Sequence, residues 1–268
     1  MLEALIVEPG KAPALKKRDT ASVPGLDLDK RDAPAELAAR TERLILLQQR
    51  LFAENTRSIL VVMQGMDTSG KDGAIKNVFR GITPAATQVA SFKAPNPAEL
   101  EHDYLWRIHA VLPERGRIGI FNRSHYEDVI AARVRGGLAK DRVKQRFHHI
   151  RELERMLVDE GTTVVKCMLH LSKDEQRERL QARLDDPEKR WKFRMGDLED
   201  RVRWDEFQAA YEDALEATST EHAPWYVVPA DRKWLRDVVV AEILVQTLER
   251  LDPQIPPGEP DLDKVVIP

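Results

Sequence analysis

The stretch Ser58-Ile59-Leu60-Val61-Val62-Met63-Gln64, followed directly by Gly65-Met66-Asp67-Thr68-Ser69-Gly70-Lys71-Asp72-Gly73, decides the fold. Its first half is a continuous apolar run, which is typical of a β-strand covered on both faces. Its second half matches G-x-x-x-x-G-K, the pattern of a phosphate-binding loop that leaves a strand and opens a helix. Backbone N–H groups of such a loop, together with the helix N-terminus, attract phosphate oxygens. The alternative is a glycine-rich strand-to-helix turn without a ligand.

Similar short apolar runs recur along the chain and alternate with helical stretches. The further predicted strands are 88–92, 117–121, 162–171 and 225–228. The predicted helices are one that begins near Asp32, with Pro34 in its first turn, and then 71–81, 97–110, 125–160 with a break, 173–185, 197–220 and 231–251. Strands that alternate with helices form βαβ units and hence a parallel sheet. We therefore expect an α/β fold with a parallel sheet of about five strands, flanked by helices.

The length of 268 residues suits one large domain with a core of its own. Residues 1–31 show no periodicity, which predicts an extended N-terminal arm; the domain itself then spans 32–252, and a Pro-rich tail follows at 253–268. No run of about 18 apolar residues exists, so we expect no membrane span. The N-terminus lacks the features of a signal peptide, which favours the cytoplasm. The single cysteine, Cys167, lies in an apolar run and is expected to pack in the core.

The loop residues divide into an amide cradle and charged groups. Lys71 is placed to reach phosphate oxygens, while Asp72 stands where phosphate loops usually have a Ser or Thr that binds magnesium. Asp67 supplies a carboxylate inside the loop, and a hard oxygen ligand suits Mg²⁺. The residues expected to contact phosphate here are Gly65, Thr68, Ser69, Gly70, Asp72 and Gly73.

A second polar cluster, Asn122-Arg123-Ser124-His125-Tyr126-Glu127-Asp128, follows the predicted strand 117–121. Ligands of open α/β sheets bind at the carboxyl ends of such strands. Glu127 and Asp128 are candidate metal ligands beside Asp67, and Arg123 is a candidate to stabilise a transferring phosphoryl group. For His125 we favour packing or hydrogen bonding over acid–base catalysis, because phosphoryl transfer depends mainly on positioning and charge neutralisation.

A third motif, Asp186-Pro187-Glu188-Lys189-Arg190-Trp191-Lys192-Phe193, breaks a helix at Pro187 and gathers cations around two aromatic residues. This composition predicts a mobile lid at about 185–200, which would exclude water and bring cations to the transition state. Trp191 or Phe193 could stack on a base or simply pack. The alternative is an exposed loop with ordinary cations.

The segment 133–155 carries eight Lys or Arg residues against three acids, although the net charge of the chain is -3. Such a basic face is either solvated helix surface or a track for a polyanion. The spacing of the charges does not distinguish the two.

Together the three motifs resemble those of the family-2 polyphosphate kinases, which have a P-loop kinase fold like that of thymidylate kinase. The likeness runs from about residue 30 to residue 250. The resemblance implies a phosphotransferase that moves phosphoryl groups reversibly between inorganic polyphosphate and purine nucleotides. It implies Mg²⁺ as cofactor, with Mn²⁺ as a substitute, bridging donor and acceptor phosphates. Asn122 and the Glu127-Asp128 pair are similar to the class that accepts both AMP and ADP; GMP and GDP are further candidate acceptors.

The same resemblance assigns roles to individual residues and to the basic surface. The implied catalytic residues are Asp67, Lys71, Arg123, Glu127, Asp128 and the lid residue Arg190, with Asp67, Glu127 and Asp128 as metal ligands. Lys189 is the second implied lid cation. Polyphosphate carries about one charge per phosphate and would be held by Lys76, Arg80, Arg133 and their neighbours. The resemblance also implies a homodimer or homotetramer, and no nucleic acid or membrane partner is expected.

Two rival functions remain open from the sequence. One is an ATP-dependent nucleotide kinase of the same fold, which differs only in its phosphoryl donor. The other is a non-catalytic polyanion-binding protein, such as a nucleic-acid binder, that retains the loop.

Overall fold

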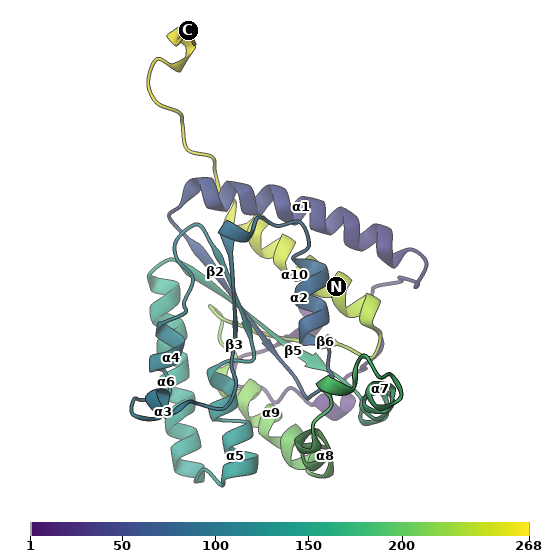
Figure 1. The fold of residues 1–268 in the computed structure, drawn as a ribbon. Coiled ribbons are helices and arrows are strands. Elements are labelled where there is room, and N and C mark those ends of the chain that lie inside the picture. Colours follow the sequence, from purple (N-terminus) through teal and green to yellow (C-terminus); the bar gives the residue numbers. More distant parts are fainter. Residues whose placement is uncertain (1, 268) are drawn as a thin grey trace.

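A six-stranded sheet forms the middle layer of the computed structural model, which describes residues 2–267 (Figure 1). The strand order is β1-β6-β5-β2-β4-β3. The strands are β1 Ile6–Val7, β2 Ser58–Gln64, β3 Thr87–Ser91, β4 Ile118–Asn122, β5 Thr162–His170 and β6 Trp225–Pro229. Neighbours from β3 to β6 pair in parallel, which confirms the predicted five-stranded parallel sheet. The sixth strand, β1, pairs antiparallel with β6 and was not predicted.

Helices cover both faces of this sheet (Figure 1). On one face lie α1 Ala33–Glu54, α2 Lys71–Val78 and α10 Lys233–Leu251. On the other lie α5 Ala131–Gly136, α6 Lys140–Asp159 and α9 Trp204–Thr218. The remaining helices are α3 Pro97–Leu100, α4 Trp106–His109, α7 Lys173–Asp185 and α8 Met195–Val202, with 3-10 turns η1 Leu2–Leu5, η2 Leu15–Lys17, η3 Pro84–Ala86, η4 His125–Asp128, η5 Arg190–Lys192 and η6 Leu262–Lys264. No helix in this described part is long and apolar enough to cross a membrane.

Strand β2 explains why the sheet needs two helical layers. All seven of its residues are buried, and successive side chains point to opposite faces. Ile59 and Val61 join the core under α1 and α10, whereas Leu60 and Val62 join the core under α6 and α9. At about 25 cal/mol per Å² of apolar area, burial on both faces is the main force that holds this strand at the centre. Cys167 of β5 is fully buried, as expected.

Several predicted helices are shorter than their patterns indicated. The stretch 97–110 contains only the single turns α3 and α4, because the Asp103 carboxylate accepts a hydrogen bond from the N–H of Leu105 and stabilises a turn between them. The stretch 197–220 is interrupted at Arg203, between α8 and α9. Helix α1 begins beside Asp32, as predicted, but the Asp32 side chain makes no capping hydrogen bond.

The N-terminal arm contributes to the core in addition to covering it. Leu2, Leu5, Val7, Leu15 and Val23 of the arm are all buried. The arm therefore closes the β6 edge of the sheet with a short strand. At the other end of the chain, the tail after α10 extends away from the body (Figure 1).

Candidate phosphate-binding site

The loop between β2 and α2 lies at the carboxyl edge of the sheet, as the motif predicted. Gly65 has a φ of +147°, and a Cβ there would lie 2.8 Å from the carbonyl oxygen of Leu169 on β5. Gly70 has a φ of +95° and forms the N-cap of α2. Both positions therefore require glycine, because other residues rarely adopt these angles. The Thr68 hydroxyl is buried and has no hydrogen-bond partner within residues 2–267, as expected of a group that hydrogen-bonds to a ligand.

Lys71 starts α2 and turns back over the loop. Its Nζ donates to the Gly65 carbonyl at 2.7 Å and lies 3.3 Å from the Met66 carbonyl and 3.4 Å from the Ser69 hydroxyl. Burial and repulsion from Arg123 lower the pKa of Lys71 to about 8, although Asp67 and nearby acids offset part of this shift. The loop thus holds a buried ammonium group beside its own backbone.

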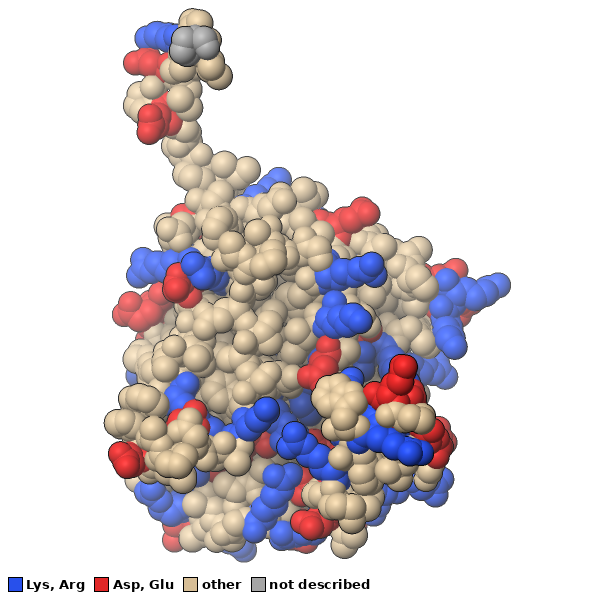
Figure 2. Space-filling view, in the orientation of Figure 1, with Lys and Arg blue, Asp and Glu red and all other residues tan. Residues whose placement is uncertain are grey.

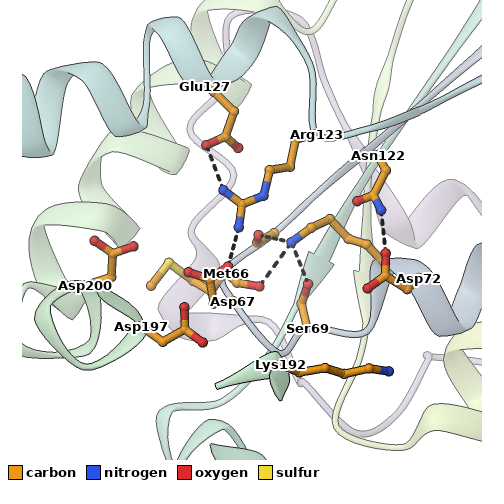
Figure 3. Close-up of polar contacts among 12 residues, drawn as sticks. Met66, Asp67, Ser69, Asp72, Asn122, Arg123, Glu127, Lys192, Asp197 and Asp200 are labelled. Atoms are coloured by element: carbon orange, nitrogen blue, oxygen red, sulfur yellow. Dashed lines mark hydrogen bonds and ion pairs between the residues drawn. The ribbon is translucent and has the colours of Figure 1, made fainter. Parts of the chain in front are cut away.

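Arg123 joins the two motifs at the ends of β2 and β4. Its guanidinium donates to the Asp67 carboxylate and lies 3.5 Å from Glu127 (Figure 3). Burial alone would raise the pKa of Asp67, but Arg123 and Lys71 hold it below its usual value. Burial raises the pKa of Glu127 against the opposing effect of Arg123. Arg123 is therefore fixed between two carboxylates.

Asp72 has a partner of its own in the second motif. The amide of Asn122 donates to the Asp72 carboxylate (Figure 3). Asp72 lies in the first turn of α2, where a negative charge is favoured by the helix dipole. The residue that replaces the usual Ser or Thr therefore ties α2 to the end of β4.

Behind the second motif lies a buried polar cluster. Lys166 of β5 lies 2.5 Å from Glu154 of α6 and donates to the Thr218 carbonyl at 2.7 Å, while the Tyr126 hydroxyl donates to Glu154 at 2.7 Å. The His125 ring packs against Tyr126 with 4.7 Å between ring centroids, and its nitrogens make no hydrogen bond within the described chain. These contacts agree with a packing role for His125, and the buried polar cluster stabilises the second motif.

In front of the loop is a cavity of about 650 Å³. Loop residues and Asn122-Arg123 form its floor, and the segment 91–94 forms one wall. The opposite wall comes from α5, α7 and the segment that contains η5 and α8; its residues are Arg135, Arg183, Trp191, Lys192, Arg194, Gly196, Asp197, Glu199 and Asp200. In Figure 2, Lys and Arg side chains gather around this region of the molecule. The cavity combines an amide loop with a largely cationic surround, which suits an extended anion.

Two acids hold the arginines of this wall in place. Arg135 donates through Nε to Asp200 at 2.7 Å and also through Nη2, and Arg183 donates to Asp197 at 3.2 Å. Burial, together with the nearby Asp67 charge, raises the pKa of Asp197 to about 6. Asp197 and Asp200 face the loop side of the cleft (Figure 3). Arginines fixed in this way lose little freedom when they bind a phosphate.

Lys71 and Arg123 line the cavity as predicted, but several other cations singled out in the sequence do not. Arg133 forms an ion pair with Asp213 and is not part of the lining, whereas Arg135 is. In the third motif, Lys189 pairs with Asp186 and the Nε of Arg190 donates to the Leu184 carbonyl. Lys192, Arg194 and Arg183 line the cavity instead. Neither the charge pattern nor the resemblance indicated which member of each cluster faces inward.

Several further predicted residues do not line this cavity: Lys76, Arg80, Glu127, Asp128 and the loop residues Gly65, Ser69 and Gly73. Lys76 and Arg80 are exposed around the end of α2 and are not among its lining. The Asp128 carboxylate lies 3.1 Å from Arg107 and borders a separate cavity of about 510 Å³ that Tyr104 also lines. The structure therefore does not bring Asp128 together with Asp67.

The carboxylates near the loop limit the kind of metal site that is feasible. Across residues 2–267, no group of three or more His, Cys, Asp or Glu side chains gathers to hold a metal. Mg²⁺, however, is usually bound through one or two carboxylates and completes its shell with substrate phosphates and water. Asp67 and Glu127, on either side of Arg123, fit that requirement. The donor set of Asp67 and Glu127 therefore suits a Mg²⁺ that is bound together with phosphate.

Comparison with known proteins gives consistent matches over most of the chain. Residues 27–256 match the family described as Polyphosphate kinase 2 (PPK2). An AMP/ADP-polyphosphate phosphotransferase of Meiothermus ruber is 52% identical over 261 residues, which cover 97% of this chain and 98% of the relative. An ADP-polyphosphate phosphotransferase of Rhodopseudomonas palustris is 46% identical over 236 residues, covering 84% and 82%. The crystal structure of polyphosphate kinase 2 from Arthrobacter aurescens superposes with a TM-score of 0.94 at 43% identity, over 98% of this chain and 93% of that chain.

Proposed function

Because this chain belongs to the polyphosphate kinase 2 family, we propose that it transfers phosphoryl groups from inorganic polyphosphate to AMP and ADP, and that the transfer is reversible. One observation carries the proposal: the phosphate loop, Arg123 and five further cations line a single cavity. These five cations are Lys93, Arg135, Arg183, Lys192 and Arg194. A cleft of this kind matches a donor that is itself a chain of phosphates.

The reaction follows from that arrangement. An oxygen of the acceptor's terminal phosphate attacks the end phosphorus of polyphosphate, and the bond from this phosphorus to its bridging oxygen breaks. The shortened polymer leaves with the electron pair, so no proton transfer is needed. Lys71 and the loop amides hold phosphate oxygens, while Arg123 neutralises charge on the group in transfer. A Mg²⁺ ion held by Asp67 and Glu127 would supply further charge neutralisation between donor and acceptor.

We also assign the segment 185–200 the role of a lid. Trp191 and Lys192 of η5 line the cavity and are exposed, whereas Asp197 and Asp200 of α8 line it and are buried. Closure over the substrates would exclude water and so prevent hydrolysis of the donor. Trp191 is 76% exposed, with the Lys192 ammonium 5.1 Å from its ring centroid, and its exposed aromatic surface would then pack on a bound nucleotide.

The acceptor preference is proposed to depend on Glu127. A carboxylate that can orient a metal matters most when the acceptor is one phosphate shorter. E127N should therefore lower the use of AMP more than the use of ADP, measured as kcat/KM for each acceptor. Equal losses would refute this assignment, and E178Q, at an exposed position of α7, serves as the control.

The experiment that tests the proposed function is a donor comparison. AMP, ADP, GMP and GDP are each incubated with Mg²⁺ and either polyphosphate or ATP, and the nucleotide products are separated. The expected result is ADP and ATP formation with polyphosphate as the sole donor. Product with ATP alone would instead identify an ATP-dependent nucleotide kinase of the same fold. We further propose a cytoplasmic homodimer or homotetramer, to be checked by light scattering of the purified protein.

A further inference from the structure

Three consecutive carbonyl groups on the outer side of the phosphate loop accept hydrogen bonds from helices α7 and α10. The bonds are Gln176 Nε2 to Asp67 O at 3.2 Å, Arg179 Nη1 to Thr68 O at 2.9 Å and Arg236 Nη1 to Ser69 O at 3.4 Å. The three donors are buried, and none of them lines the cavity on the opposite side of the loop. The loop is therefore fixed, on the side away from the cavity, by side chains that do not line the cavity.

Arg179 makes the most extensive of these contacts. Besides the Thr68 carbonyl, its guanidinium donates to the carbonyls of Ala230 at 2.7 Å and Asp231 at 2.8 Å, just after β6. Its Nε donates to Glu175, one turn earlier on α7, at 2.7 Å. One planar, forked group thus connects the loop to the end of another strand, a geometry that lysine cannot reproduce.

The direction of these carbonyls sets the direction of the loop amides. In a trans peptide unit the C=O and the following N–H point in opposite directions, and the described chain contains no cis peptide bond. The Asp67 carbonyl accepts from Gln176 of α7, and the Ser69 carbonyl accepts from Arg236 of α10 and, at 3.3 Å, from Arg179 of α7. The N–H groups of Thr68 and Gly70 therefore point to the opposite side of the loop, and both residues line the cavity. The N–H of Ser69, which follows the Thr68 carbonyl, instead donates to the Met66 carbonyl at 3.1 Å. Thr68 also has a φ of +67°, which is unfavourable for a β-branched residue and must be maintained by its surroundings.

The Arg236 guanidinium lies so close to the loop that a side chain at Gly70 would collide with it. A Cβ on Gly70 would lie 1.8 Å from Arg236 Nη1, and one on Gly73 would lie 3.2 Å from Nη2. The guanidinium is also bonded to Asp237 at 2.6 and 2.8 Å, as Arg179 is to Glu175. Since both charges are compensated locally, their effect on phosphate is geometric more than Coulombic.

We propose that Arg179 and Arg236 are positioning residues for phosphoryl transfer, which turn the amides of the phosphate loop toward the phosphate chain. This inference rests on the proposed function, because the ligand that the amides meet is taken to be polyphosphate. Misplacement of a binding group by about 1 Å can lower a rate by about 100-fold. Loss of either fork should therefore weaken phosphate binding and turnover without removing any residue that touches the substrate.

The test compares R179M and R179K with wild type and with R177A, a control at an exposed position of the same helix whose side chain is 67% exposed. The affinity for polyphosphate is measured by calorimetry at several salt concentrations, together with kcat/KM and the melting temperature. R179M should bind polyphosphate at least about tenfold more weakly. R179K keeps the charge but not the forked guanidinium, so its affinity for polyphosphate should exceed that of R179M by less than about threefold. The affinity of R177A should match that of wild type.

The salt dependence separates positioning from direct contact. For a linear polyanion, the slope of log affinity against log salt counts the cations that meet phosphates. A positioning role leaves this slope unchanged in R179M, whereas a slope lower by about one charge would overturn the proposal. Full recovery by R179K would overturn it as well. Should R179M fail to fold, R236K, which keeps its charge beside Asp237, is measured in the same way and is expected to lose at least about tenfold in affinity.

Wild-type behaviour distinguishes this inference from the function on which it rests. Wild-type protein that neither binds nor uses polyphosphate would refute the proposed function. Wild-type protein that binds polyphosphate, together with R179K and R236K variants of equal affinity, would refute only the positioning role.

Discussion

Raising the pH from 7 to 9 should remove the positive charge of Lys71 from the unliganded protein and weaken its use of polyphosphate. The ammonium is buried under the loop, and this burial, together with repulsion from Arg123, lowers the pKa of Lys71 to about 8. A group whose pKa is lowered in this way is charged below about pH 8 and neutral above it. Since kcat/KM reports the free enzyme, this parameter should show the decline.

The size of the decline follows from the pKa. With a pKa of about 8, about 90% of Lys71 is charged at pH 7 and about 10% at pH 9, so kcat/KM for polyphosphate should fall about ninefold. A phosphate monoester has its second pKa near 6, so the acceptor is already about 90% doubly ionised at pH 7, and its own titration changes the rate little over this range. Bound phosphate favours the ammonium form, and the decline in kcat should therefore begin at a higher pH than the decline in kcat/KM.

The assay measures product formation at saturating acceptor and varied polyphosphate, with K71R as the control. Arginine stays charged throughout the range, so the ninefold decline should be absent in K71R; if this variant has no turnover, its affinity for polyphosphate is compared instead. An equal decline in K71R, or a constant wild-type value, would refute the reasoning. Unfolding is not the cause, because between about pH 8 and 10.5 the unfolded chain holds a proton on Lys71 that the native state lacks. This group alone therefore makes the native state more stable as the pH rises.

Three further predictions concern stability, the cavity wall and ionic strength. K166M should lower the free energy of unfolding by about 3–5 kcal/mol, because it leaves the buried Glu154 carboxylate without the Lys166 ammonium. Urea denaturation measures this free energy, and K166M/E154Q should recover part of the loss. R135A should raise KM for polyphosphate at least about tenfold, because it removes a charge-assisted contact. R133A should raise KM less than about twofold, because Arg133 pairs with Asp213 outside the cavity. Steady-state kinetics measure both values, and a larger effect of R133A than of R135A would contradict the cavity lining. Raising salt from about 50 to 200 mM should weaken polyphosphate binding by at least about tenfold, and a flat response would indicate recognition by a few buried contacts instead.

Features with a local cause were predictable from the sequence. The apolar run 58–64 is strand β2 to the residue, because a strand buried on both faces needs an uninterrupted set of apolar side chains. The stretch 173–185 is likewise α7 to the residue, where Ser172 caps the helix by accepting from the Glu175 N–H at 3.1 Å. The phosphate loop followed from glycines that only certain backbone angles require.

Features that depend on contacts between distant segments were not predictable. Strand β1 is two residues long, and its register on β6 exists only once the sheet has formed. Asp128 sits next to Glu127 in sequence, but its carboxylate pairs with Arg107 and borders a separate cavity, whereas the Glu127 carboxylate lies 3.5 Å from Arg123. Nothing in their order along the chain distinguishes them.

The parallel sheet, the phosphate loop and the class of chemistry could be predicted without coordinates, because they depend on hydrophobic periodicity, backbone angles and the residue types within one short segment. The fold was needed to show which cations line the cavity, which acids pair with them and which arginines bond the loop carbonyls. Those choices depend on the direction of side chains on helices packed from different parts of the chain, and a linear pattern of charges does not contain that direction.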